Sequence, residues 1–522
     1  MSKQKVEQST LTLLNVEVDA EELNTKLFGS YADQPTFNSK EGNSGWSVSM
    51  SSDGTRVAIG APFHHKGGSN GDDGLVRIYE LQSDNSWSQL GADIVGVEYN
   101  DYNGYSVSLS ADGTRVAMGA YGHNKNGAND AGHVRIYQYT PSGTSSWTLY
   151  GDIEGHGAND LSGRSVSLSS DGTRVAIGAT MNDTSNGSRS NTGHVRIYEN
   201  TSGSMWTKLG SDIDGEAAGD LSGNYLSLSD DGSTVAIGAY RNDGNSGSTT
   251  DDRGHVRIYN WNGLAWVQRG ADIDGEAEKD YSGYSVSMNN DGTIVAIGAK
   301  QNDGTTGNDL DNRGHVRVYK WDGTNWVQRG TDLDGESTED ESGASVSIND
   351  DGDWVIIGAQ FADAPGKGNT GHARVYRWDG TAWSKIGDDI DGEAGDQLGN
   401  AVTMNSLGSS VALSSLEHDP LPKSDPGIVR VYSSPQPYVS ISVSPSSISE
   451  ASGSSTITVN SSVYTSDVTV KINASSTAVG GGRDYTLSAY ELTIPAGATT
   501  ASTTLTAVQD AISVSYTHLR AH

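Results

Sequence analysis

Short runs of apolar residues recur along the chain, each bounded by Gly, Asn and Asp. Residues 106–109 alternate small polar and apolar side chains, a period of two that predicts a β-strand. The Asp112-Gly113 turn that follows is a strong hairpin signal, because glycine accepts positive φ at no steric cost. Residues 116–120 are apolar almost throughout, which predicts a second strand buried on both faces.

Two further strands complete this pattern. A long loop rich in Asn, Asp and Gly leads to a third strand, as at residues 193–198. A second hairpin then leads to a fourth strand that carries a tryptophan. The tryptophan recurs as Trp87, Trp147, Trp206, Trp266, Trp326 and Trp383. We expect these side chains to be buried between neighbouring sheets.

The four-strand pattern repeats about every sixty residues. The glycine before each first strand marks seven units, at Gly45, Gly104, Gly163, Gly223, Gly283, Gly343 and Gly399. Seven four-stranded units whose sheets are buried on both faces predict a β-propeller, in which each sheet packs against its neighbours around an axis. The predicted fold class is therefore all-β: a seven-bladed β-propeller of four-stranded blades, followed by an incomplete β-sandwich.

The boundaries follow from where the repeat begins and ends. The seventh unit lacks a fourth strand, and residues 24–30 resemble the fourth strand at residues 206–211, so we expect an N-terminal strand to close the last blade. This gives an N-terminal extension at 1–22, a propeller at 23–434 and a proline-containing linker at 435–437. A Ser/Thr/Val-rich domain with period-two alternation follows at 438–512. Residues 513–522 do not continue that pattern and are interpreted as a non-native tail, so we expect the chain to be a fragment of a longer protein.

The repeat, with its G-Y-S-V-S, D-G, V-A-M-G-A and G-H-V-R-I-Y segments, resembles the FG-GAP repeat of integrin α-subunits and bacterial surface proteins. Residues 104–106 stand where that family has Phe-Gly, and residues 59–62 match its Gly-Ala-Pro. The resemblance covers about residues 23–434 and implies a propeller used for adhesion or ligand binding. The family's calcium loop, D-x-D-x-D-G-x-x-D, is replaced here by a tight turn such as Ser52-Asp53-Gly54, so propeller calcium is not implied.

Residues 438–512 resemble a Calx-beta domain. The matching segments are residues 448–453, Asp484-Tyr485, residues 494–497 and Asp510. In calcium-binding members of that family an early Glu, the Asp of the Asp-Tyr pair and a late acidic cluster bind the ion. The resemblance therefore implies Glu450, Asp484 and Asp510 as Ca²⁺ ligands. The late cluster and the final strand are missing, so we expect the site to be weak or empty in this chain.

Composition narrows the classes of partner. With 34 Lys and Arg against 66 Asp and Glu, the formal charge is −32, which disfavours nucleic acid and anionic membranes and favours cations. The absence of cysteine excludes disulfides, cysteine nucleophiles and thiolate metal sites. No apolar run approaches the ~18 residues of a membrane span, and residues 1–30 lack the pattern of a signal peptide.

The loops that close the units carry paired carboxylates, and two interpretations of them stay open. The pairs are Asp214 and Asp220, Asp274 and Asp280, Asp334 and Asp340, and Asp391 and Asp396. Flexible loops rich in oxygen suit Ca²⁺, which takes 6–8 oxygen ligands. Alternatively, Asp and Asn close turns by accepting hydrogen bonds from nearby backbone.

Histidine and arginine recur at the third strand. The histidines (His133, His194, His255, His315 and His372) are too far apart between blades to share a metal ion, so we expect each to make a structural hydrogen bond. The arginines (Arg77, Arg135, Arg196, Arg257, Arg317, Arg374 and Arg430) need carboxylate partners if they lie between sheets. We therefore expect ion pairs between strands or between blades.

The sequence predicts a non-enzymatic binding or adhesion scaffold that is monomeric and lies outside the cell or on its surface. Its protein or glycan ligand is expected on the face of the propeller that carries the loops with paired carboxylates. The alternative is a lectin, or a propeller hydrolase or lyase, acting on polysaccharide. An enzyme needs one blade to depart from the repeat with catalytic residues at the axis, whereas the units look nearly interchangeable.

Overall fold

The computed structural model describes residues 12–18, 42–65, 71–84, 86–125, 127–141, 146–183, 190–244, 250–304, 311–363, 368–417, 427–433, 439–444, 454–461, 468–475, 485–488, 491–494 and 500–507. They form strands and loops in two units. One unit comprises residues 28–433, and the other comprises residues 1–27 and 434–522.

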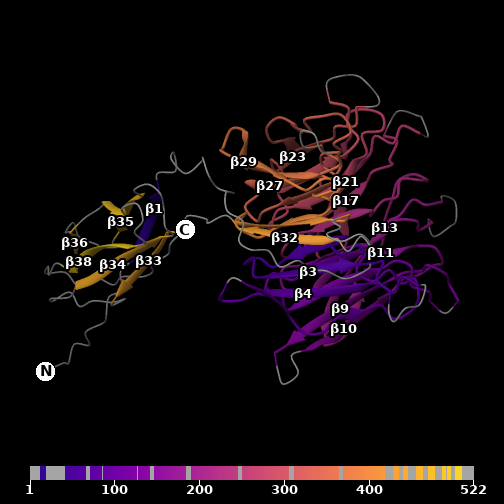
Figure 1. The fold of residues 1–522 in the computed structure, drawn as a ribbon, viewed down its shortest axis with the longest axis horizontal. Helices are drawn as coiled ribbons and strands as arrows, with labels where there is room; N and C mark the ends of the chain where they lie inside the picture. The colour runs from indigo at the N-terminus through magenta and orange to yellow at the C-terminus, as the bar shows by residue number, and fades with distance from the viewer. Residues whose placement is uncertain are drawn as a thin grey trace. The chain divides into compact units, whose positions relative to one another are not determined.

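Residues 28–433 contain seven antiparallel sheets, which confirms the seven-bladed propeller (Figure 1). The first three blades are β2 (Ser47–Met50), β3 (Arg56–Ala61), β4 (Leu75–Leu81), β5 (Trp87–Gln89) and β6 (Ile94–Val95); β7 (Ser106–Leu109), β8 (Arg115–Ala120), β9 (His133–Thr140) and β10 (Ser146–Glu154); and β11 (Ser162–Leu168), β12 (Arg174–Ala179), β13 (His194–Ser202), β14 (Met205–Lys208) and β15 (Ile213–Asp214). The next two are β16 (Tyr225–Leu228), β17 (Thr234–Ala239), β18 (His255–Trp261), β19 (Trp266–Gln268) and β20 (Ile273–Asp274); and β21 (Ser282–Met288), β22 (Ile294–Ala299), β23 (His315–Trp321), β24 (Trp326–Gln328) and β25 (Leu333–Asp334). The last two are β26 (Ser345–Ile348), β27 (Trp354–Ala359), β28 (His372–Trp378) and β29 (Trp383–Asp391); and β30 (Val402–Met404), β31 (Ser410–Ser415) and β32 (Ile428–Ser433).

In four blades the fourth strand is divided in two at a glycine with positive φ, whereas the equivalent Gly387 (φ 71°) lies inside the undivided β29. In the fourth blade Gly270 (φ 84°) separates β19 from β20, and both pieces pair with β18. The seventh blade has three strands among the residues described. The prediction that residues 24–30 supply its fourth strand lies outside the described residues.

The core consists of the second and third strands, sandwiched between neighbouring blades. Val175 and Ile177 of β12 are buried and pack with Val134 and Ile136 of the preceding blade. The repeat glycine lets the blades approach each other. Gly163 has φ 90°, and a Cβ on Gly119 of the preceding blade would overlap the carbonyl oxygen of Gly163. Neither position therefore accepts a side chain.

The ring closes between the seventh blade and the first, which lie side by side in Figure 1 (orange and indigo). At the end of the axis formed by the tight hairpins, seven backbone hydrogen bonds make a continuous belt, each residue donating its N–H to the carbonyl oxygen of the next. The order is Ser52, Ala111, Ser170, Asp230, Asn290, Asp350, Ser406 and back to Ser52, with N···O distances of 2.8–3.3 Å. A closed ring of backbone hydrogen bonds thus joins all seven blades.

The second unit consists of two antiparallel sheets. One contains β1 (Thr12–Val18), β35 (Val468–Ser475) and β37 (Glu491–Ile494). The other contains β33 (Val439–Ser444), β34 (Ser454–Ser461), β38 (Thr500–Ala507) and β36 (Tyr485–Leu487). Part of the segment that the sequence assigns to an N-terminal extension thus pairs, as β1, with β35.

Candidate functional site

The first strands of the seven blades surround a pocket of about 420 Å³ on the propeller axis. The residues that form its walls lie at the beginnings of the first strands and directly after the second strands. The long loops start after the second strands, so the pocket lies at the end of the propeller axis that carries these loops. Every blade contributes to the lining, through residues that include Trp46, Tyr105, Arg164, Asn224, Tyr284, Gln360 and Asn400.

The pocket also gathers a position at which the seven units differ. The position after the repeat glycine carries Trp46, Tyr105, Arg164, Asn224, Tyr284, Ala344 and Asn400. The next residue is serine in five units but Tyr225 and Ala401 in the fourth and seventh, and the apolar strand positions change little. Positive φ at the glycine, as at Gly163, turns the chain into the first strand and brings the variable residue to the axis. The units are therefore not interchangeable at the axis, contrary to the sequence expectation.

Aromatic rings line one side of the pocket mouth. The rings of Trp46 and Tyr105 have centroids 5.3 Å apart, and Tyr105 meets Tyr121 edge-on at 4.6 Å. The guanidinium carbon of Arg164 lies 4.4 Å from the centroid of the Tyr105 ring and 5.4 Å from that of Tyr121. Burial raises the pKa of Tyr121 to about 12, so its hydroxyl stays protonated and able to donate near neutral pH.

Arg164 is the one charged side chain among the described residues that line the pocket. No described carboxylate lies within ion-pair distance of its guanidinium. Lys300, just outside the lining, is different because its ammonium contacts Glu341 at 2.9 Å and lies 4.4 Å from the Tyr284 ring centroid. The pocket thus offers a planar cation that no carboxylate of the described residues contacts, beside aromatic faces and side-chain amides.

The acidic loops lie at the same end of the blades, and one carboxylate of each predicted pair closes its turn. Asp220 is buried, and its Oδ2 accepts hydrogen bonds from the N–H groups of Glu216 (3.1 Å) and Ala217 (2.8 Å) and from the side chain of Asn242 (3.2 Å). Burial raises its pKa above the usual range. Asp280, Asp340 and Asp396 accept equivalent backbone N–H bonds. These contacts are those of the turn-closing interpretation.

The other carboxylate of each pair is exposed and lies at the end of the fourth strand. Asp214 is opposite His194 in the ladder, and its carboxylate groups with His194 and Asp212. Asp274 and Asp334 stand in the same register, 4.0 and 3.9 Å from their histidine Nδ1 atoms, and Asp391 lies opposite His372. The two carboxylates of a pair therefore have different neighbours. The Calx-beta-like candidates Glu450, Asp484 and Asp510 lie outside the described residues.

The repeated arginines confirm the ion-pair prediction. All seven contact carboxylates at 2.8–3.6 Å, either on the adjacent fourth strand, as with Arg77 and Asp93, or in the preceding blade, as with Arg257 and Glu216. The predicted structural hydrogen bond of the histidines is not made by Nε2 in three blades. The Nε2 atoms of His133, His255 and His315 are buried without a partner among the described residues, while their Nδ1 atoms lie 3.9–4.0 Å from carboxylate oxygens.

Neither a protein-family model nor a curated protein matches the chain. Within the residues described, no helix has the length and apolar character to cross a membrane. The propeller architecture is therefore established by the structure itself, and the resemblance to FG-GAP and Calx-beta domains stays a prediction.

Proposed function

We propose that this protein is a non-enzymatic binding scaffold whose axial pocket holds an acidic saccharide, a sugar ring that carries a carboxylate or similar anion. One observation carries the proposal: a variable position of the repeat lies at the axis, where it places aromatic rings and Arg164, which no described carboxylate contacts, around a pocket of about 420 Å³. That volume falls within the range of ligand pockets, about 300–1,000 Å³.

The chemistry of the lining selects this ligand class. Tyr and Trp offer an apolar face together with a hydrogen-bonding group, which suits a sugar ring that has both C–H and hydroxyl faces. A guanidinium binds a carboxylate through two parallel hydrogen bonds. The amides of Asn224, Gln360 and Asn400 can donate to and accept from hydroxyl groups.

The charge of −32 does not oppose this ligand at physiological salt. Charges separated by more than about 8 Å are screened there, whereas Arg164 acts at contact distance. The FG-GAP-like repeat supports placing the scaffold outside the cell or on its surface, where an adhesion protein meets polysaccharide.

Calorimetric titration with oligosaccharides that contain uronic acid, and with their neutral counterparts, tests the proposal. We expect the acidic sugars to bind at least about tenfold more tightly, since a charge-assisted hydrogen bond contributes about 1.5–3 kcal/mol. Arg164→Gln should remove this preference, whereas Lys279→Gln, which deletes an exposed cation on an acidic loop, should leave it unchanged. Equal affinity for acidic and neutral sugars would contradict the proposal.

The contact between Arg164 and Tyr105 favours one second candidate, a polysaccharide lyase. In such an enzyme the guanidinium neutralises the uronate carboxylate and a tyrosine moves the proton of the β-elimination. Incubation with uronate polymers and measurement of unsaturated sugar ends by ultraviolet absorbance distinguish the two functions. Product that is lost in Tyr105→Phe would identify the enzyme.

A further inference from the structure

In the second blade, histidines stand both at the start of the third strand (His133) and three residues after the second strand (His123). The first blade also has a histidine at the latter position, His64, but its third strand begins with Leu75. His123 follows the second strand of its blade by three residues, as Asn182, Asn242 and Asn302 follow theirs. In the fourth blade the Asn242 amide donates to Asp220. In the second blade the imidazole of His123 donates from Nδ1 to Oδ1 of Asp101 at 3.0 Å.

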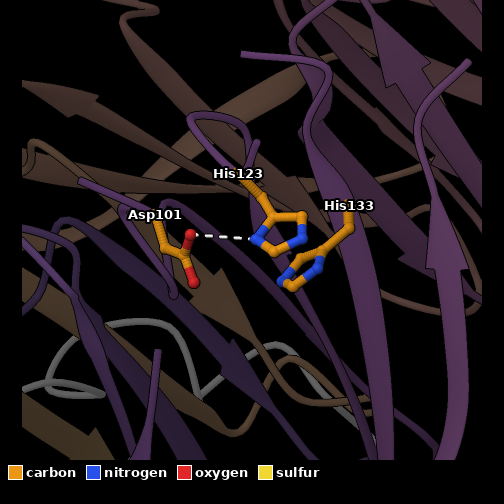
Figure 2. A group of neighbouring side chains, drawn as sticks. All are labelled: Asp101, His123 and His133. Carbon is orange, nitrogen blue, oxygen red and sulfur yellow. Dashed lines mark hydrogen bonds and ion pairs between the residues drawn. The ribbon is translucent and has the colours of Figure 1, made fainter. Parts of the chain in front are cut away.

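This substitution brings two imidazoles and a carboxylate together. Figure 2 shows the His123 ring stacked on that of His133, with centroids 3.9 Å apart and planes 24° from parallel. Asp101, His123 and His133 each present one oxygen or nitrogen, and these three atoms lie within 4.8 Å of one another. Asp101 and His133 are 0% and 1% exposed.

The buried cluster has an unused ligand atom. Nε2 of His133 is buried and has no hydrogen-bond partner among the residues described. A neutral imidazole has a lone pair on one ring nitrogen, which is the atom that binds a metal ion. A buried polar atom without a partner is unfavourable, and a bound cation would supply that partner.

We propose that Asp101, His123 and His133 form a binding site for a divalent transition metal of the zinc class. Two imidazoles and one carboxylate are ligands for Zn²⁺, whereas Ca²⁺ prefers 6–8 oxygens. On binding, the proton on Nδ1 of His123 exchanges to Nε2, so the imidazole stays neutral and Nδ1 becomes a ligand. One ring must also turn about its Cβ–Cγ bond, since stacked rings cannot both aim lone pairs at one ion.

Asp152 stands beside His133 at the place where an outer carboxylate would support such a site, though beyond hydrogen-bond distance in this structure. Its Oδ1 lies 3.9 Å from Nδ1 of His133, on the nitrogen opposite the unpartnered Nε2. A carboxylate in this position orients a metal-bound imidazole and raises its basicity.

The equivalent clusters in other blades lack the second imidazole. They combine one histidine with two carboxylates, as in His194, Asp212 and Asp214. In that cluster Asp212 already contacts Arg196 at 2.8 Å and Lys208 at 2.6 Å, so protein cations occupy the place of a metal ion. Among the described residues, the second blade is thus distinguished by the pairing of His123 with His133.

Zinc titration of the full chain after chelator treatment tests the site, with calorimetry for stoichiometry and Co²⁺ absorption for the ligand set. His123→Asn introduces the residue that the third, fourth and fifth blades carry at this position, so the variant should fold with an unchanged melting temperature and lose one bound equivalent. Asp152→Asn should weaken binding about 10–100-fold.

The repeat also allows the reverse experiment. Asn242→His places an imidazole beside Asp220 and His255 and should add one equivalent of zinc. Oδ1 of Asp220 and Nε2 of His255 are likewise buried without partners among the residues described. The same stoichiometry and affinity in wild type and His123→Asn, or no zinc binding by a folded wild type, would overturn the assignment. Saccharide binding at Arg164 should be unaffected by His123→Asn, so this test stands apart from that of the proposed function.

Discussion

At the scale of single residues, the buried histidines make the free energy of unfolding depend on pH. His194 and His372 lie at the starts of their third strands and are 2% and 7% exposed. Burial is the main cause that lowers the pKa of His194 to about 3 and that of His372 to about 4. Such a ring stays neutral in the folded protein while the unfolded chain, with a pKa near 6.5, takes up a proton.

Replacing one of these rings should make the protein less sensitive to acid. Because the folded pKa of His194 is below the unfolded one, its contribution is complete above about pH 6.5 and declines as pH falls towards 3, by about 1.4 kcal/mol per pH unit. Between pH 7 and 5, His194→Gln should therefore lose about 2 kcal/mol less unfolding free energy than wild type, measured by urea denaturation. The exposed His156→Gln is the control, and an equal loss in all three proteins would contradict the argument.

At the scale of elements, the fourth strands fasten each blade to the one before it. The indole N–H groups of Trp147, Trp266 and Trp326 donate to the carbonyl oxygens of Leu90, Leu209 and Arg269 in the preceding blade, at 2.7–2.8 Å. The location between blades was predicted from the sequence. The extent of burial was not, because Trp147 is 9% exposed while the other described tryptophans of this set are half-buried at the outer edge.

A graded pair of substitutions separates the hydrogen bond from the packing. Trp266→Phe keeps an aromatic ring but removes the donor to Leu209, which should cost about 1 kcal/mol. Trp266→Ala removes both and should cost about 3 kcal/mol, the lower end for such a truncation because the indole is half-buried. Leu264→Ser in the same hairpin changes a side chain that is 88% exposed and should be neutral in chemical denaturation. Equal stability of Trp266→Ala and wild type would show that the indole does not hold the blades together.

At the scale of the molecule, the sequence predicted the blades but not the site. Strands and hairpins follow from local signals, such as the alternation at residues 106–109 and the Asp112-Gly113 turn. The strands of each blade could therefore be predicted from that blade's own sequence. The pocket joins residues that are about sixty positions apart and becomes a unit only when the ring closes. The similarity of the units also draws attention away from the position after the repeat glycine, where they differ. Arg164 was visible in the sequence as a departure from the repeat, and His123 with His133 as the unit that combines both repeated histidine positions. That signal could have found both sites.

The charge of −32 predicts how the whole molecule responds to ions. Any added salt should raise the melting temperature by screening self-repulsion. A specific Ca²⁺ site should add RT ln(1 + [L]/Kd) beyond the effect of Mg²⁺ at equal ionic strength. For the full chain we expect Ca²⁺ and Mg²⁺ to act equally, because backbone N–H groups already bind Asp220 and the predicted Calx-beta-like site lacks its late acidic cluster.

Changing Asp214 and Asp220 together to Asn should therefore lower the melting temperature in calcium and in chelator alike, since Asp220 closes its loop without a metal ion. A calcium-specific stabilisation that this double variant abolishes would instead assign the ion to the acidic loops. If Glu450→Gln abolishes it and the double variant does not, the ion belongs to the Calx-beta-like segment. Differential scanning calorimetry of the three proteins in CaCl₂, MgCl₂ and chelator distinguishes these outcomes, because screening affects all three proteins in the same direction.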